Sequence, residues 1–125
     1  MKRDLLSIGD LATEEILHLL DVAARLKNDL ATGCEHSWLR GKTLAMIFEK
    51  PSLRTRVTFE TGMHQLGGMA LYLGPTDIQL GRRESVPDIG KNLSLWVDLI
   101  MARTYAHTSI IELASSAKVP VINGL

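Results

Sequence analysis

The sequence predicts an α/β fold, a three-layer domain in which a central four-stranded parallel sheet is flanked by helices. Two observations predict it: four short apolar runs suit buried strands, and stretches with helical periodicity separate them. Strands that alternate with helices in this way pair in parallel through right-handed crossovers. The 125 residues suffice for one domain, residues 1–125, around a single core.

The first half of the chain contains two predicted helices and one predicted strand. In residues 13–32 leucine, isoleucine and alanine recur every three or four positions, the period of an amphipathic helix, with Thr13 as its N-cap. The continuous apolar run Thr43–Phe48 is typical of a strand that is covered on both faces. Residues 53–66 form the second predicted helix, which ends at the pair Gly67-Gly68.

The second half of the chain continues this alternation of strands and helices. Ser85 is the expected N-cap of its first long helix, since Pro87 suits the first turn and Asp88 complements the helix dipole. The predicted elements are, in order, strand Met69–Leu73, a long polar loop over residues 74–84, helix 86–97, strand 99–102, helix 107–117 and strand 119–122.

Composition and charge exclude several classes of protein. The 14 Lys+Arg residues balance the 14 Asp+Glu residues, so no excess of cations favours a nucleic acid as partner. The single cysteine, Cys34, excludes an intramolecular disulfide and suits a reducing cytosol. With no secretory segment and no apolar run near the roughly 20 residues that span a bilayer, we expect a cytoplasmic protein with no membrane partner. Its 46% hydrophobic residues indicate either an unusually complete core or apolar surface meant for another protein.

The predicted topology also indicates where a ligand binds. In an open parallel sheet, ligands bind beyond the carboxyl ends of the strands. The candidate binding segments of this chain are therefore residues 49–56, residues 103–107 and the three residues after Ile122. Arg103, directly after the third predicted strand, carries a guanidinium that can reach the same crevice as the first segment.

The first of these segments breaks a rule of helix design. Lys50, Arg54 and Arg56 crowd the start of a helix, where each cation is disfavoured by roughly 0.3–1 kcal/mol. Ser52 and Thr55 add hydroxyl groups, and the free backbone amides of the first turn add further donors. An anion at this position explains the cluster, because charge-assisted hydrogen bonds are strong and helix N-termini after strands are natural phosphate sites.

These residues have alternatives to an anion site. In one, Glu49 and Glu60 neutralise the arginines and the face is merely solvated. A P-loop at Gly41-Lys42-Thr43 fails, because the glycine required five positions earlier is His36 and the motif precedes a strand. No GxGxxG motif follows a predicted strand, and the histidines lack the spacing of metal ligands.

The segment from Phe48 to Glu60, Phe-Glu-Lys-Pro-Ser-Leu-Arg-Thr-Arg-Val-Thr-Phe-Glu, closely resembles the Ser-Thr-Arg-Thr-Arg carbamoyl-phosphate motif of the aspartate and ornithine carbamoyltransferases. The Phe-Glu-Lys-Pro start and the later Asp-Ile-Gln-Leu-Gly loop are more similar to the ornithine branch than to the aspartate branch. The resemblance covers essentially the whole chain, and four further segments fall in family order: Leu66-Gly-Gly68, Asp77-Ile-Gln-Leu-Gly-Arg-Arg-Glu-Ser85, Ile100-Met-Ala-Arg-Thr104 and Val119-Pro-Val-Ile-Asn-Gly-Leu125.

The resemblance implies a site for carbamoyl phosphate and a role for each of its residues. Arg54, Thr55 and Arg103 would be the catalytic residues, with Thr55 and Arg103 also reaching the carbonyl oxygen. In a homotrimer of the family type, Arg83 would enter the site of the neighbouring subunit. Leu53 stands where the family usually has threonine, which matters little if only its amide contacts phosphate. The carbamoyl-phosphate ligands would be Ser52, Leu53 through its backbone, Arg54, Thr55, Gln79 and Arg103.

The implied activity is the transfer of the carbamoyl group from carbamoyl phosphate to L-ornithine, giving L-citrulline and phosphate without a metal or organic cofactor. Family members continue past Asn-Gly-Leu into a His-Pro-x-Gln motif and a second, amino-acid-binding domain, and a C-terminal helix packs back on the first domain. For this chain we therefore expect exposed apolar surface, weak binding of carbamoyl phosphate and little or no transferase activity. Alternatives are the aspartate carbamoyltransferase branch and a non-catalytic anion-binding or oligomerisation module with the same fold.

Overall fold

The computed structural model describes residues 2–125 and contains one sheet of four parallel strands. The strands are β1 (Thr43–Phe48), β2 (Met69–Leu73), β3 (Leu99–Arg103) and β4 (Val121–Asn123), and their spatial order is β2-β1-β3-β4. Every neighbouring pair is parallel. The predicted α/β class, strand number and parallel pairing are therefore confirmed.

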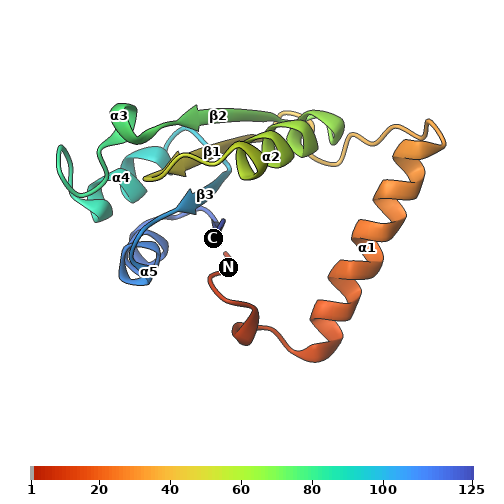
Figure 1. Cartoon of the computed structure of the whole chain (residues 1–125), viewed down its shortest axis with the longest axis horizontal. Coiled ribbons are helices and arrows are strands. Elements are labelled where there is room, and N and C mark those ends of the chain that lie inside the picture. Colours follow the sequence, from red (N-terminus) through yellow and green to blue (C-terminus); the bar gives the residue numbers. More distant parts are fainter. Residues whose placement is uncertain (1) are drawn as a thin grey trace.

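Helices cover the two faces of this sheet (Figure 1). On one face α2 (Leu53–Gln65) places Met63 and Phe59 against the side chains of Leu44 and Met46. On the other face α4 (Val86–Leu93) and α5 (His107–Ser116) pack on the alternate residues of β1, β3 and β4. Opposite faces follow from right-handed crossovers, because the chain moves from β1 to β2 in one direction and from β2 through β3 to β4 in the other.

This topology creates a switch point at the carboxyl ends of β1 and β3. The chain leaves β1 over one face of the sheet and leaves β3 over the other, so the two connections diverge above neighbouring strands. A crevice of this kind is where open α/β sheets bind their ligands. The positions that face it are the residues after Phe48 and after Arg103, which are register partners in the sheet.

The second half of the chain departs from the predicted element bounds in one loop, one helix and two strands. The predicted polar loop contains a short helix, α3 (Pro75–Ile78), whose start is held by the Asp77 carboxylate accepting from the Gly74 amide at 2.8 Å. Helix α4 ends at Leu93 instead of residue 97, and the chain tightens into a turn in which the amides of Leu95 and Trp96 donate to the carbonyls of Asn92 and Leu93 at 3.0 Å. Strands β3 and β4 each end one residue later than predicted, at Arg103 and Asn123, and β4 begins at Val121 instead of residue 119.

Helix α1 (Thr13–Ala31) forms as predicted but stands away from the sheet (Figure 1). Its N-cap is Ala12 and not Thr13, because the carboxylate of Glu15 accepts from the Ala12 amide at 2.9 Å. None of its residues is buried, and Leu17 and Leu20 are about 60% exposed, at 57% and 61%. Part of the expected exposed apolar surface therefore lies on this helix, and further large apolar side chains are exposed elsewhere, among them Leu53, Leu95 and Trp96.

The chain on either side of α1 ties the helix to the domain. Before it, Leu5 runs alongside β4: its amide donates to the Val121 carbonyl at 2.9 Å, and its carbonyl accepts from the Asn123 amide at 2.8 Å. Residues Ile8–Asp10 then form a single 3-10 turn, η1. After α1, His36 Nε2 lies 2.9 Å from the Asp29 carboxylate, which fixes the loop against the last turn of the helix.

Candidate functional site

The start of α2 leaves its backbone donors without an internal partner. Ser52 occupies the N-cap position, but its side chain makes no capping bond to the helix. Its hydroxyl instead donates to Thr55 Oγ1 at 3.0 Å. The first turn contains no acidic residue, and Leu53 is 78% exposed. The amides at this helix start are therefore available to an external acceptor, together with two hydroxyl groups.

Two of the three cations of this segment are held by neighbouring side chains. The Arg56 guanidinium lies 3.7 Å from the centre of the Tyr72 ring, and its Nε lies 3.2 Å from the Glu60 carboxylate. The Lys50 ammonium lies 5.3 Å from the centre of the Tyr105 ring. Across residues 2–125, Arg54 has neither an ion pair nor an aromatic partner. Neutralisation by carboxylates thus holds for Arg56, whereas Arg54 keeps its charge available for an anion.

Arg103 is the last residue of β3 and supplies the second available guanidinium. Its Nη1 donates to the carbonyl of Gly124 at 3.0 Å, whereas its Nε is buried with no hydrogen-bond partner within the described chain. A buried donor left unpaired is costly, so such a group indicates a missing acceptor. Gly124 permits this arrangement, because a Cβ there would lie 2.4 Å from the sulfur of Met101.

Gln79 and Arg83, both predicted from the loop after β2, lie in different surroundings. Gln79 adopts a left-handed conformation (φ 42°) at the end of α3 and lines a pocket of about 300 Å³ with Glu49, Arg82 and Tyr105. Arg83 is exposed and lines a second pocket, of about 380 Å³, which lies between α3 and α4. The structure thus brings Gln79 to the carboxyl end of β1 and does not bring Arg83 there.

Two residues lie within the predicted binding segments but were not among the predicted site residues. Glu49 follows β1 directly, and its carboxylate accepts from the backbone amide of Tyr105 at 3.0 Å. Thr104 is buried, and its hydroxyl donates to the carbonyl of Ala106 at 2.9 Å. Both residues shape the segment that follows Arg103. The position of Glu49 directly after a buried strand could have indicated a site role. From the sequence, Glu49 is interpreted only as a carboxylate that neutralises the neighbouring arginines.

The carboxylates with a lowered pKa lie away from this site. The Lys42 ammonium, with help from the Thr43 amide, lowers the pKa of Asp98, which joins the amino ends of β1 and β3. The Ala12 amide, with help from the Arg3 guanidinium, lowers the pKa of Glu15 at the start of α1. These carboxylates stabilise the fold, whereas the start of α2 combines amides, hydroxyl groups and an unpaired guanidinium without a carboxylate in its first turn.

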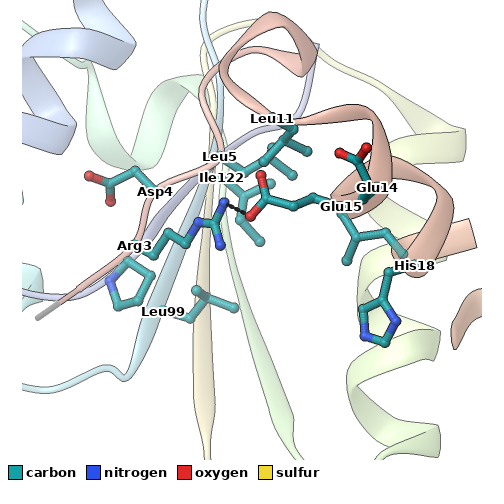
Figure 2. A pocket seen from close by; sticks show the side chains of 11 residues that line it. Arg3, Asp4, Leu5, Leu11, Glu14, Glu15, His18, Leu99 and Ile122 are labelled. Atoms are coloured by element: carbon teal, nitrogen blue, oxygen red, sulfur yellow. Dashed lines mark hydrogen bonds and ion pairs between the residues drawn. The ribbon is translucent and has the colours of Figure 1, made fainter.

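A larger pocket, of about 470 Å³, lies between the start of α1 and the amino end of β3 (Figure 2). Leu5, Leu11, Leu99 and Ile122 form its apolar wall, and Arg3 is paired with Glu15 at its edge. It lies away from Arg103 at the other end of β3, and its remaining carboxylates disfavour an anion.

The described residues, 2–125, offer neither a metal site nor a membrane-spanning helix. There, no three His, Cys, Asp or Glu side chains are placed to hold a metal ion. The same residues include no helix that is both long and apolar enough to cross a membrane.

Comparison with known proteins identifies the family. Residues 3–125 match the model of the carbamoyl-phosphate-binding domain of aspartate/ornithine carbamoyltransferases. The chain is 51% identical over 125 residues to an ornithine carbamoyltransferase of Methanoculleus marisnigri, covering all of this chain and 40% of that protein. It spans about 40% of the length of the curated relatives it matches.

Solved structures give the same result. The ornithine carbamoyltransferase of Pyrococcus furiosus superimposes with a TM-score of 0.96 at 53% identity, over 98% of this chain and 39% of that one. The catalytic subunit of the M. jannaschii aspartate transcarbamoylase superimposes with a TM-score of 0.88 at 34% identity, over 100% of this chain and 41% of that one. The chain therefore belongs to the aspartate/ornithine carbamoyltransferase family and is its carbamoyl-phosphate-binding domain.

Proposed function

We propose that this chain supplies the carbamoyl-phosphate site of an ornithine carbamoyltransferase, which converts carbamoyl phosphate and L-ornithine to L-citrulline and phosphate. One observation carries the proposal: the uncapped start of α2 and the unpaired Nε of Arg103 lie at the ends of neighbouring strands, at the switch point of the sheet. Amides, hydroxyl groups and guanidinium groups are the donors that a phosphate dianion requires.

The ligand contacts divide between the two segments. The phosphate group would accept from the hydroxyl groups of Ser52 and Thr55, from the Leu53 amide and from the Arg54 guanidinium. Arg103 would bridge the phosphate and the carbonyl oxygen, which offers an acceptor to its unpaired Nε. Gln79 lines the adjoining pocket, from which its amide would reach the carbamoyl group.

These contacts account for the chemistry of carbamoyl transfer. The neutral amine of ornithine attacks the carbonyl carbon, a C–N bond forms, and the bond from that carbon to the phosphate oxygen breaks. The nitrogen loses a proton, and inorganic phosphate leaves with the electron pair. Arg54 and Arg103 would stabilise the charge that grows on the leaving phosphate, and Thr55 with Arg103 would donate to the carbonyl oxygen as its charge rises.

The proposal also specifies the amine substrate, ornithine instead of aspartate. Identity to the solved ornithine enzyme is 53%, against 34% to the solved aspartate enzyme. Both comparisons cover almost the whole chain, so the difference favours ornithine. The test is an assay of the chain joined to the segment that its relatives carry beyond it. Citrulline formation that requires ornithine supports the proposal, and a product formed only from aspartate contradicts it.

The assembly is proposed as a homotrimer in which Arg83 reaches the site of the neighbouring subunit. Arg83 is exposed and lies outside its own subunit's Gln79 pocket, which is the position that such a role requires. Sedimentation equilibrium of the joined protein tests the assembly. A mass of three chains supports it, and a monomer that binds carbamoyl phosphate with full affinity contradicts it.

Calorimetric titration of this chain with carbamoyl phosphate tests the site itself. We expect weak, saturable binding by the wild-type chain and a loss of about tenfold or more in Arg54→Ala, the size expected for a charge-assisted hydrogen bond. Lys91→Ala is the matched control, because Lys91 is an exposed cation on α4. Equal binding by the wild type and Arg54→Ala would contradict the site assignment.

A further inference from the structure

Glu49 places a carboxylate beside the site where an anion is expected to bind. The residue follows β1 directly and lines the pocket that also contains Gln79. Within residues 2–125 its carboxylate forms no ion pair with a lysine or arginine. Its charge therefore opposes the ligand without neutralising a neighbour, so a different interaction must explain a glutamate at this position.

The hydrogen bonds of Glu49 supply that interaction. Its backbone amide donates to the carbonyl of Arg103 at 3.0 Å, which extends the β1–β3 ladder by one bond. Its side-chain Oε2 accepts from the amide of Tyr105, also at 3.0 Å, across 56 positions of sequence. One residue thus holds the β3 segment on both sides of Thr104, whose own side chain is buried.

We propose that Glu49 is a positioning residue: its carboxylate fixes the backbone from Arg103 to Tyr105, so that the Arg103 guanidinium faces the ligand bound at the start of α2. The inference rests on the proposed function. Arg103 is the last residue of its strand, and the following Tyr105 is 68% exposed. The Glu49 carboxylate therefore holds the chain where the sheet ladder no longer does.

The neighbouring Lys50 supports the same segment by a different contact. Its ammonium lies over the ring of Tyr105, at 5.3 Å from the ring centre. Both residues therefore contact Tyr105: Glu49 contacts the backbone amide of Tyr105, and Lys50 contacts its ring. A cation–π contact at an exposed site is weak, so the carboxylate hydrogen bond, which is charge-assisted, is expected to dominate.

Two substitutions separate positioning from charge. Glu49→Ala removes the acceptor, whereas Glu49→Gln keeps a side-chain oxygen that accepts from the Tyr105 amide and removes only the charge. Calorimetric titration with carbamoyl phosphate is expected to show binding weakened about fivefold or more in Glu49→Ala. Glu49→Gln is expected to bind within about threefold of the wild type, since one hydrogen bond to a neutral acceptor replaces one to a charged acceptor. Glu35→Ala, which removes an exposed carboxylate from the loop after α1, is the matched control.

Amide hydrogen exchange, measured by NMR without ligand, adds a readout that a general loss of stability would not give. We expect Glu49→Ala to lose protection at the Tyr105 amide while the amides of β1 keep theirs. If the wild-type chain binds and Glu49→Ala binds equally well, the positioning role is overturned and the proposed function stands. Tighter binding by both Glu49 variants would also overturn it, since Glu49 would then act only through its charge. If the wild-type chain does not bind carbamoyl phosphate at all, the proposed function fails, and the positioning role fails with it.

Discussion

Helices α2 and α4 both begin after a serine, but their first turns treat their backbone donors in opposite ways. Each helix follows a loop and begins after a serine, Ser52 or Ser85, and each serine hydroxyl bonds to the side chain three residues later, at 3.0 and 2.7 Å. In α4 that side chain is Asp88, and Ser85 also accepts from the Asp88 amide at 3.2 Å. In α2 the residue is Thr55, and Ser52 makes no capping bond.

The contrast shows what distinguishes a structural helix start from a binding one. The start of α4 caps the Asp88 amide with the Ser85 hydroxyl and complements its dipole with the Asp88 carboxylate. The start of α2 does neither, and Arg54 adds a cation where the dipole disfavours one. An anion from outside the chain would accept from the free amides of α2 and balance the charge of Arg54. At the start of α4, the Ser85 hydroxyl and the Asp88 carboxylate already fill these two roles.

The largest expected effect comes from placing in the first turn of α2 the acidic residue that α4 carries there. In Thr55→Asp, a carboxylate would occupy the position of a phosphate-binding hydroxyl, so binding of carbamoyl phosphate should fall on the order of 100-fold. The melting temperature should stay the same or rise, because an acid in the first turn contributes about 0.3–1 kcal/mol. Calorimetry and thermal melts measure the two effects. Asp88→Thr is the control, and we expect it to lower the melting temperature and leave binding unchanged.

The two serines provide a smaller test. Ser85→Ala removes a helix cap, so the free energy of unfolding should fall by about 1 kcal/mol with unchanged binding of carbamoyl phosphate. Ser52→Ala removes a ligand contact instead, so binding should weaken about fivefold while stability changes by less than about 0.5 kcal/mol. Urea denaturation measures the free energy of unfolding of both variants, and calorimetry measures their binding of carbamoyl phosphate. Equal losses of stability in the two variants would mean that Ser52 is an ordinary cap.

Within α2, the two arginines should also differ. Arg56 is stacked on Tyr72 and paired with Glu60, so Arg56→Ala should cost about 0.5–1.5 kcal/mol of stability through both contacts. Its effect on binding should stay within about threefold, because its charge is already partnered. Calorimetry alongside Arg54→Ala measures the difference. A loss of binding as large as that of Arg54→Ala would place Arg56 in the site.

Helix α1 gives the smallest effect, and it depends on pH. The Ala12 amide, with the Arg3 guanidinium, lowers the pKa of Glu15 in the folded protein. The stabilising contribution of Glu15 is therefore fully present above the ordinary pKa of a glutamate, about 4.3, and is lost as the pH falls through its lower folded value. The protection factors of the amides at the start of α1, corrected for the intrinsic exchange rate at each pH, should fall in that acidic range in the wild type and show no such step in Glu15→Gln. A step of equal size in Glu15→Gln would contradict the assignment.

The sequence was sufficient for the four strand segments and for the cluster at the start of α2, because both depend on residues close together in the chain. It predicted the amphipathic α1 but could not show that Leu17 and Leu20 stay exposed, since periodicity identifies an apolar face and not what covers it. The contact of Glu49 with Tyr105 lies beyond local patterns as well. It spans 56 positions and depends on the register of β1 with β3, which only the folded structure defines.

An NMR titration of this chain with carbamoyl phosphate tests most directly whether the start of α2 is the binding site. We predict saturable shifts of the amides of Leu53, Arg54 and Thr55 and of the side-chain Nε–H of Arg103. The amides of Val86 and Asp88, at the start of α4, should not move. Shifts of equal size at the starts of both helices, or saturable binding that leaves α2 unchanged, would contradict the account.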